Sequence, residues 1–257
     1  MTIVTLAAAV GSYAEAVPPV PVRRHVRRTW VYRLPDRHAG PIAIVPDGCI
    51  DLRWIAGRLS VDGPHRLAEA ETLSPGALVV GLRFQPGAAP RWLGLPASEL
   101  TDRCIALEDI WGGDARHLAE WAGEARTPSG IARRLETAMS RRATINPTDG
   151  EMRRVFALLE GATHAPVPDV ATVAARLGLG ERTLRRRCHE AFGYGPKTLG
   201  RILRFQRFLH LAYHCQGEVA LARCAGEAGY ADQAHLSRDA RHLSGLSPRT
   251  IAAQLVR

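Results

Sequence analysis

The sequence predicts an α+β protein in which a small β-rich domain with a helical extension precedes an all-α domain with two helix-turn-helix motifs. Three observations predict this order. Strand-like segments separated by Pro and Gly turns fill residues 28–85, helical periodicity begins near residue 97, and beyond residue 151 only Gly and Pro interrupt the helices. We therefore divide the chain into a β-rich domain (1–97), a helical connector (98–146) and a C-terminal helical domain (147–257).

The strand prediction rests on the alternation of side chains. In CIDLRWI, residues 49–55, the apolar Ile50, Leu52 and Trp54 alternate with Cys, Asp and Arg, which is the period of a half-buried strand. RTWVYRL, IAIVP, RLSVD and ALVVGLRF are strand-like as well, and the turn formers PDRHAGP, PDG and SPGA lie between these segments.

The connector carries more apolar side chains than a linker needs, among them Leu118, Trp121, Ile131 and Leu135. We expect it to pack on the β-rich domain or on a second copy of the chain, so a homodimer is one expected assembly. ATINPTDGE then predicts a short linker, and the spacing Thr148–Glu151 is that of a capping box at the start of the next helix.

Composition excludes several classes of protein. With 257 residues, 46% of them apolar, the chain is long enough to bury a real core. Five cysteines without a C-x-x-C pair argue against a disulfide scaffold and a structural zinc site. No run approaches the roughly eighteen apolar residues of a membrane helix, and the first residues lack a basic signal-peptide start, so we expect a cytoplasmic protein without a membrane partner.

The positive charge is unevenly distributed along the chain. Residues 1–150 carry 18 Arg and 16 acidic residues, whereas residues 151–257 carry 15 Arg and one Lys against 9 acidic residues. Arg is suited to forked hydrogen bonds with phosphate and guanine. The asymmetry predicts a polyanionic partner for the C-terminal half.

A helix-turn-helix spacing occurs in VATVAARLGLGERTLRRRCHEAFGYGP. The motif needs a small residue where the helices cross, a turn residue with a left-handed backbone, and an apolar residue that packs the second helix on the first. Ala174, Gly178 and Leu184 meet these needs. With Leu184 facing inward, the basic side chains of the second helix face outward.

A second copy begins at residue 225, with Ala225, Gly229 and Leu236 in the corresponding places and a turn one residue longer. The middle turn of its second helix is polar, which is expected of a face that meets base edges instead of protein. Between the copies, KTLGRILRFQRFLHLAYH predicts a long helix with arginines three residues apart on its surface. The candidate DNA-contacting residues are Arg182, Arg185, Arg186, Gln233, Ala234, His235, Ser237, Arg238, Arg241, Arg201 and Arg204.

Two such motifs, 52 residues apart in a basic half-chain, resemble the AraC/XylS family of transcription regulators over residues 151–257. Tyr230 after the second Gly, the pair Ser237-Arg238, and the closing Gly-x-Ser-Pro are the residues that carry the resemblance in the second motif. The resemblance implies that each recognition helix enters a major groove on one face of double-stranded DNA. It also implies RNA polymerase as a partner.

The segments VPDGCIDLRW and GLRFQPGAAPRWLGLPASELTDRCIALEDIWG resemble the N-terminal sensor halves of some AraC-type regulators over roughly residues 13–115. This resemblance implies a small cupin-like β-barrel that binds a small-molecule effector or mediates dimerisation. Within such a barrel, Trp54 with Arg53 or Arg83, and Trp92 near the mouth, are candidate effector-binding residues. Each tryptophan also fits a core position.

Cys49 is a further candidate for this pocket, as a sensing thiol, and its alternative role is that of a buried structural thiol. His25, His38 and His65 lie in scattered contexts without a carboxylate at ligand spacing. We therefore expect no metal and no cofactor.

Three classes of function compete, and a sequence-specific transcription regulator is favoured. A DNA-repair or alkylation-response protein with this DNA-binding domain would need a zinc-binding Cys cluster, yet only Cys49 and Cys104 occur in the first 150 residues. A thiol-based sensor is the other form of that alternative. An enzyme is not expected, because no nucleophile–base pair, phosphate loop or metal motif is present.

Overall fold

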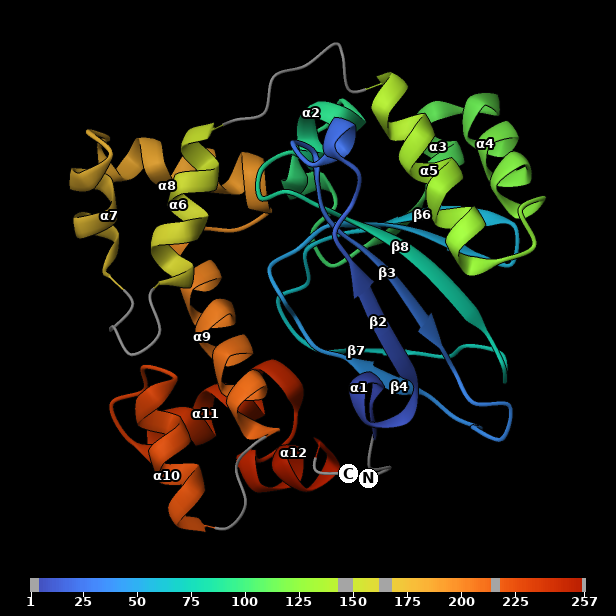
Figure 1. Ribbon diagram of the computed structural model, residues 1–257. Coiled ribbons are helices and arrows are strands. Elements are labelled where there is room, and N and C mark those ends of the chain that lie inside the picture. Colours follow the sequence, from blue (N-terminus) through green and yellow to red (C-terminus); the bar gives the residue numbers. More distant parts are fainter. Residues whose placement is uncertain (1–4, 143–149, 162–167, 214–217, 256–257) are drawn as a thin grey trace.

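The computed structural model describes residues 5–142, 150–161, 168–213 and 218–255, and a β-rich half lies beside a helical half (Figure 1). This confirms the α+β class. Within the described residues, no helix is both long and apolar enough to cross a membrane.

The larger sheet has six strands, and all neighbouring strands in it are antiparallel. Across the sheet they are β2 (Ser12–Ala16), β3 (Val26–Arg33), β8 (Leu78–Phe84), β5 (Asp51–Ile55), β6 (Arg58–Asp62) and β9 (Cys104–Ala106). The predicted alternation in residues 49–55 is confirmed, since Leu52 and Trp54 face the helices while Asp51 and Arg53 face the opposite side.

The smaller sheet has three strands: β1 (Thr5–Leu6) pairs parallel with β4 (Ile42–Ile44), which pairs antiparallel with β7 (Glu69–Glu71). Trp30, Tyr32 and Ile42 pack together between the two sheets. In the described part of the chain, no strand pairing joins one sheet to the other, so the expected closed barrel is wrong. The edge strands of the smaller sheet, β1 and β7, are two and three residues long and pair with neither edge strand of the larger sheet, β2 or β9.

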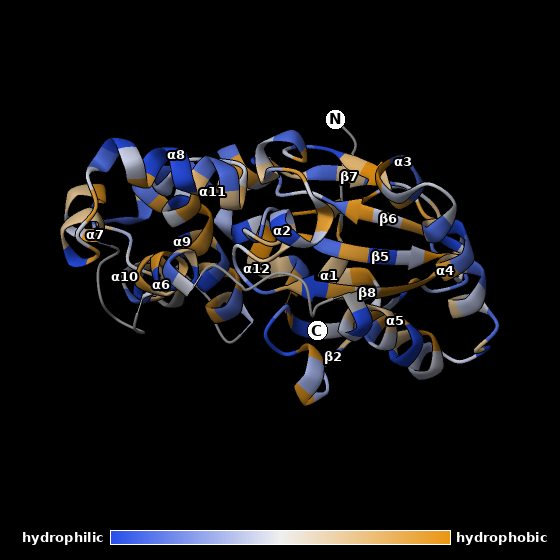
Figure 2. Cartoon of the chain, turned by 90° about the horizontal axis from the view of Figure 1, so that it is seen from above, coloured by the Kyte–Doolittle hydropathy of each residue, from blue (hydrophilic) through white to orange (hydrophobic). Residues whose placement is uncertain are grey.

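Helices cover the other face of the larger sheet, as Figures 1 and 2 show. They are α2 (Ala89–Leu93), α3 (Leu107–Trp111), α4 (Gly113–Gly123) and α5 (Pro128–Arg142). This half also contains three short helical segments, α1 (Ala7–Val10), η1 (Val20–Val22) and η2 (Ala97–Glu99). Ile131 and Leu135 of α5 are buried in the core that includes Leu52. Of the two expected packings of the connector, the structure therefore shows the one against the β-rich domain.

The helical half consists of seven helices in the described residues. They are α6 (Gly150–Glu160), α7 (Val170–Arg176), α8 (Glu181–Phe192), α9 (Pro196–Ala212), α10 (Glu218–Glu227), α11 (Gln233–Ser244) and α12 (Pro248–Leu255). The predicted helix start at Thr148 lies outside the described residues. In Figure 1, α9 runs between one helical group at its N-terminal end and a second at its C-terminal end.

The two halves are packed against each other. Leu6 is buried in the core of the helical half, and its backbone N–H donates to the Gln254 side chain at 2.9 Å. At Gly48 a Cβ would lie 3.1 Å from the Leu199 side chain, and its φ of +78° is left-handed. Gly48 therefore satisfies two demands at once: the tight Pro-Asp-Gly turn and the close approach of α9.

Candidate DNA-binding surface and ligand pocket

The first helix-turn-helix consists of α7 and α8, and its geometry follows the three predicted positions. Ala174 is 3% exposed and Leu184 is 0% exposed, so the helices cross where the sequence predicts. Gly178 has a φ of +66°, the left-handed conformation that the turn requires. Asp169 caps α7 by accepting from the Thr172 backbone N–H at 2.7 Å.

The outward face of α8 is basic. Arg182, Arg185 and Arg186 are exposed, and two of them form ion pairs on the helix surface, with Glu181 and Glu190 at 2.8 and 2.7 Å. Exposed pairs of this kind stabilise a protein by only about 0–1 kcal/mol. Both guanidinium groups can therefore exchange their carboxylate for a phosphate or a guanine at little cost.

The second helix-turn-helix consists of α10 and α11. Gly229 has a φ of +88° and Leu236 is fully buried, as predicted. Asp232 caps α11 by accepting from the His235 N–H at 2.6 Å. Gln233, Ala234, Arg238 and Arg241 are exposed, whereas His235 and Ser237 are half-buried.

His235 covers the turn of the second motif. Its ring lies edge-on to the Tyr230 ring with centroids 5.1 Å apart, and its Nε2 is 3.8 Å from Asp239. The described contacts of His235 are thus within the second motif, and its contact with DNA stays a prediction.

Arg201 and Arg204 of the linker helix point toward α11. Arg201 Nε donates to Asp239 Oδ1 at 2.8 Å, and Arg204 lies 3.5 Å from Oδ2 and 4.9 Å from the centre of the Tyr230 ring. Both arginines therefore have partners inside the protein, and their contact with phosphate stays a prediction. Sequence reasoning missed Asp239; the only signal is a carboxylate on the inward face of α11, beside Ala240.

A pocket lies between the two sheets of the β-rich half. Its volume is about 150 Å³. Aromatic and aliphatic side chains form much of its wall, among them Tyr13, Trp30, Tyr32, Ile42, Ile44 and Val79. Strands from both sheets therefore build a cavity although they do not close into one barrel.

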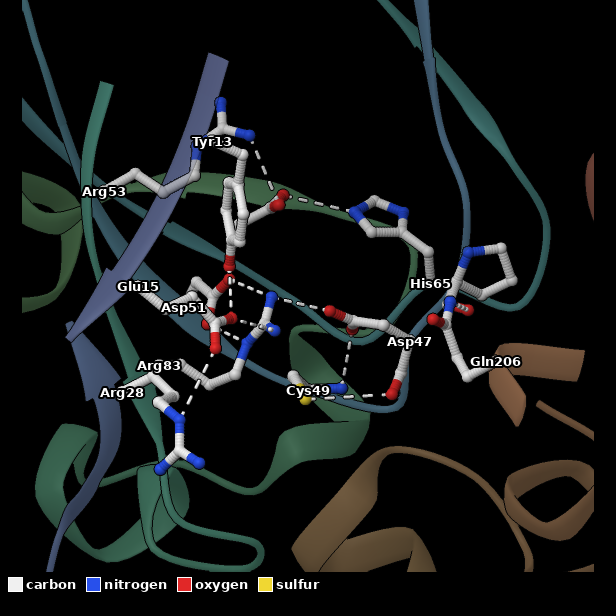
Figure 3. Close-up of polar contacts among 12 residues, drawn as sticks. Tyr13, Glu15, Arg28, Asp47, Cys49, Asp51, Arg53, His65, Arg83 and Gln206 are labelled. Carbon is white, nitrogen blue, oxygen red and sulfur yellow. Dashed lines mark hydrogen bonds and ion pairs between the residues drawn. The ribbon is translucent and has the colours of Figure 1, made fainter. Parts of the chain in front are cut away.

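Two arginine-centred clusters line the polar side of this pocket (Figure 3). Arg83 contacts Asp47 at 2.7 Å and Asp51 at 3.0 Å. Arg53 contacts Asp62 at 3.3 Å and makes two hydrogen bonds with Glu71. The opposite charges hold both guanidinium groups in their charged form, and they raise the pKa of Arg53 and Arg83 despite burial, which acts in the other direction.

His65 lies at the edge of the second cluster. Its Nε2 is 3.2 Å from Asp62 and its Nδ1 is 3.3 Å from Glu69, so the expectation that His65 has no carboxylate at ligand spacing is wrong. Asp62 ends β6 three residues before His65, and Glu69 begins β7 four residues after it. The sequence does not reveal the shape of the loop that brings the three side chains together. Within the described residues, no group of three or more potential ligands that could hold a metal is present.

Cys49 also lines the pocket, but its environment does not activate it. Burial raises the pKa of the Cys49 thiol well above its ordinary value, and Asp47 adds to this effect. Reactive cysteines have a lowered pKa. Cys49 is half-buried and forms part of the pocket wall, and its raised pKa does not favour the role of a sensing thiol.

The two candidate tryptophans lie away from the pocket. Trp54 is on the opposite face of β5 from Arg53, and its Nε1 donates to the Ala119 carbonyl of α4 at 3.1 Å. Trp92 is 7% exposed and packs against Trp111, with ring centroids 4.2 Å apart. The structure thus brings Arg53, Arg83 and Cys49 together and places both tryptophans in the core.

Comparisons with known proteins match these two halves separately. The model of a helix-turn-helix domain family matches residues 173–254, and the model of a domain of unknown function, DUF6597, matches residues 14–106. No curated protein matches the chain in sequence.

Among solved structures, an apo variant of ToxT from Vibrio cholerae shares the fold, with a TM-score of 0.50 and 14% identity over 89% of this chain and 97% of ToxT. Wild-type ToxT with a bound unsaturated fatty acid has a TM-score of 0.46 and 13% identity over 88% and 94%. The family match identifies residues 173–254 as a helix-turn-helix domain, and the likeness to ToxT shows that the fold is shared along most of the chain.

Proposed function

We propose that this chain is a transcription regulator of the AraC type, which reads DNA with the exposed faces of α8 and α11 and changes its DNA binding when a small effector enters the pocket between the sheets. The DNA-facing residues are Arg182, Arg185, Arg186, Gln233, Ala234, Arg238 and Arg241. Arg201 and Arg204 fix the position of α11. Such a protein acts in the cytoplasm, at promoters, together with RNA polymerase.

One observation carries the effector part of this proposal: the same turn forms the pocket wall and contacts the DNA-binding half. Pro46, Asp47 and Cys49 line the pocket, and the Pro46 carbonyl accepts from Gln206 Nε2 of α9 at 2.7 Å (Figure 3). A ligand that displaces this turn must alter its contact with the linker helix. Since α9 joins both helix-turn-helix motifs, a change in this contact can reach both of them.

A second contact runs from the pocket to the recognition helix α11. His65 lines the pocket, and three residues later the Ala68 N–H donates to the Leu243 carbonyl of α11 at 2.7 Å. An effector therefore has two routes from one cavity, to α9 and to α11. A ligand shifts the equilibrium only by its difference in affinity for the two arrangements.

A pocket-filling substitution tests this proposal without knowledge of the effector. We expect Val79→Phe, which adds a ring to the pocket wall, to change the affinity of the full chain for its operator about fivefold or more. Val20→Phe, the same substitution at a site that is 73% exposed, is the matched control and should leave that affinity unchanged. In a Gln206→Ala background, Val79→Phe should change the operator affinity by a smaller factor. If the Val79→Phe protein and the unsubstituted chain bind the operator equally well, the pocket does not regulate DNA binding.

A further inference from the structure

The ligand class of the pocket follows from its charges, given the proposed role of the pocket as the effector site. We propose that the ligand is a small organic cation with one ring or a short branched chain, which also carries a neutral oxygen acceptor, and that it is not an anion.

The carboxylates of the pocket outnumber its guanidinium groups. Four of them line it, Asp47, Asp51, Asp62 and Glu71, against Arg53, Arg83 and the imidazole of His65, so the carboxylates remain in excess even when His65 is protonated. Each guanidinium already contacts two of these carboxylates. An anionic ligand would have to displace a carboxylate from its arginine and would then face the repulsion of the others, whereas a cation reduces the negative excess.

Burial makes this excess costly. Asp51 is 8% exposed and Arg53 is 7% exposed, so solvent screens their charges weakly. Burial raises the pKa of the Asp51 carboxyl, and the Arg83 charge opposes that shift without cancelling it. The nearby positive charge therefore only partly balances the negative charge of the Asp51 carboxylate. An ammonium group in the cavity would supply the rest of that balance.

The rest of the pocket suits the remainder of such a molecule. Trp30 and Tyr32 present aromatic surface, which attracts organic cations as well as apolar groups. Among the described residues, two N–H groups of side chains that line the pocket, Trp30 Nε1 and Arg53 Nε, have no hydrogen-bond partner, and a ligand oxygen that reaches either one would satisfy it. The volume of about 150 Å³ is below the roughly 300–1,000 Å³ of pockets for drug-sized ligands, which favours a single-ring molecule over a long acyl chain.

A charge-matched panel tests the proposal on the full chain. Single-ring and branched-alkyl skeletons are each offered as an ammonium, a carboxylate and an alcohol, with para-methoxyphenethylammonium, para-methoxyhydrocinnamate and para-methoxyphenethyl alcohol as one trio and palmitoleate as a long-chain acid. Calorimetry and thermal unfolding measure binding. We expect at least one ammonium to bind about tenfold or more tightly than its carboxylate.

Variants locate the binding site. Glu71→Gln and Asp47→Asn each remove a charge with little change of shape, and each should weaken ammonium binding about tenfold while leaving the alcohol unchanged. Asp109→Asn, at an exposed carboxylate of α3, is the control. Because the two variants change different arginine-centred clusters, the proposal can still be tested if one of them does not fold.

The outcomes separate this proposal from the one on which it rests. If a carboxylate or palmitoleate binds more tightly than the ammonium, and Arg53→Gln abolishes that binding, the pocket remains the effector site. The proposal of a cationic ligand is then overturned. Ammonium binding that neither Glu71→Gln nor Asp47→Asn weakens also overturns it. If no member of the panel binds, the cation is wrong and the pocket loses its assignment as effector site.

Discussion

Arg201 of the linker helix donates through Nε to the buried Asp239 of the second recognition helix, at 2.8 Å from Oδ1. Asp239 is 5% exposed, and Arg204 approaches its other carboxylate oxygen at 3.5 Å. One carboxylate thus fixes α11 relative to α9. The position of the second recognition helix therefore depends on a polar contact as well as on the apolar core.

The first prediction concerns this carboxylate. Asp239→Asn leaves two half-buried guanidinium groups without their counter-charge, so we expect the free energy of unfolding to fall by about 1–3 kcal/mol. Operator affinity should fall as well, because α11 loses its fixed position. Urea unfolding and DNA titration measure the two effects. Glu120→Gln, at an exposed carboxylate of α4, is the control, and an equal loss of stability in both variants would contradict the special role of Asp239.

The second prediction concerns the apolar residue that packs α11 on its partner helix. Leu236 is fully buried, so Leu236→Ala removes buried methyl groups and leaves a cavity, which costs about 2–5 kcal/mol. Ala234→Ser, at an exposed position on the same helix, should change the free energy of unfolding by less than about 0.5 kcal/mol. Chemical denaturation of both variants checks this difference. Similar values for the two would mean that Leu236 does not hold the helices together.

The third prediction is a pH dependence that originates at His65. Its hydrogen bond with Asp62 raises the pKa of His65 above the ordinary value, and the carboxylate charges act in the same direction. A raised pKa in the folded state means that the protonated ring stabilises the fold. This contribution is complete below the ordinary value of about 6.5 and is lost as the pH rises through the higher pKa of the folded protein.

The measurement for His65 is the difference in urea midpoint between the natural chain and the His65→Gln variant, followed from about pH 6 to about pH 9. The difference should be largest at the acidic end and decline as the pH rises. Because both proteins share all other titrating groups, their contributions cancel to first order. A difference that grows with pH would show that the neutral ring is the stabilising form.

The helix-turn-helix motifs are predictable from the sequence because local spacing determines them. Each motif is set by a few residues that are close in sequence, such as Ala174, Gly178 and Leu184 of the first motif. Each of these positions makes a demand that few residue types satisfy: a close crossing of helices, a left-handed backbone or a buried apolar contact. The same is true of the strand at residues 49–55, where alternation alone separates Arg53 from Trp54.

The pocket is less predictable because it depends on contacts between distant segments. The prediction of a closed barrel was wrong because the two sheets do not pair with each other. No local pattern in the first hundred residues reveals which strands pair. Arg83 and Asp47 are 36 positions apart, and only the arrangement of β8 beside the turn at residue 47 joins them. Likewise, the chemistry of Trp54 suits both a pocket wall and a core. Trp54 belongs to the core because it lies on the face of β5 that α4 covers.

The central claim is that α8 and α11 read different parts of one DNA site, and base-by-base binding of two variants tests it most directly. Full-length Arg185→Ala and Arg238→Ala proteins are titrated with an operator panel in which each base pair is changed singly, with Arg116→Ala, on α4, as the matched control. Each recognition-helix variant should lose discrimination of about 1–3 kcal/mol at one end of the site only, and the two ends should lie about one helical turn of DNA apart. The control should keep the full pattern. A uniform loss of affinity across the panel for both variants would contradict the claim, because neither arginine would then read bases.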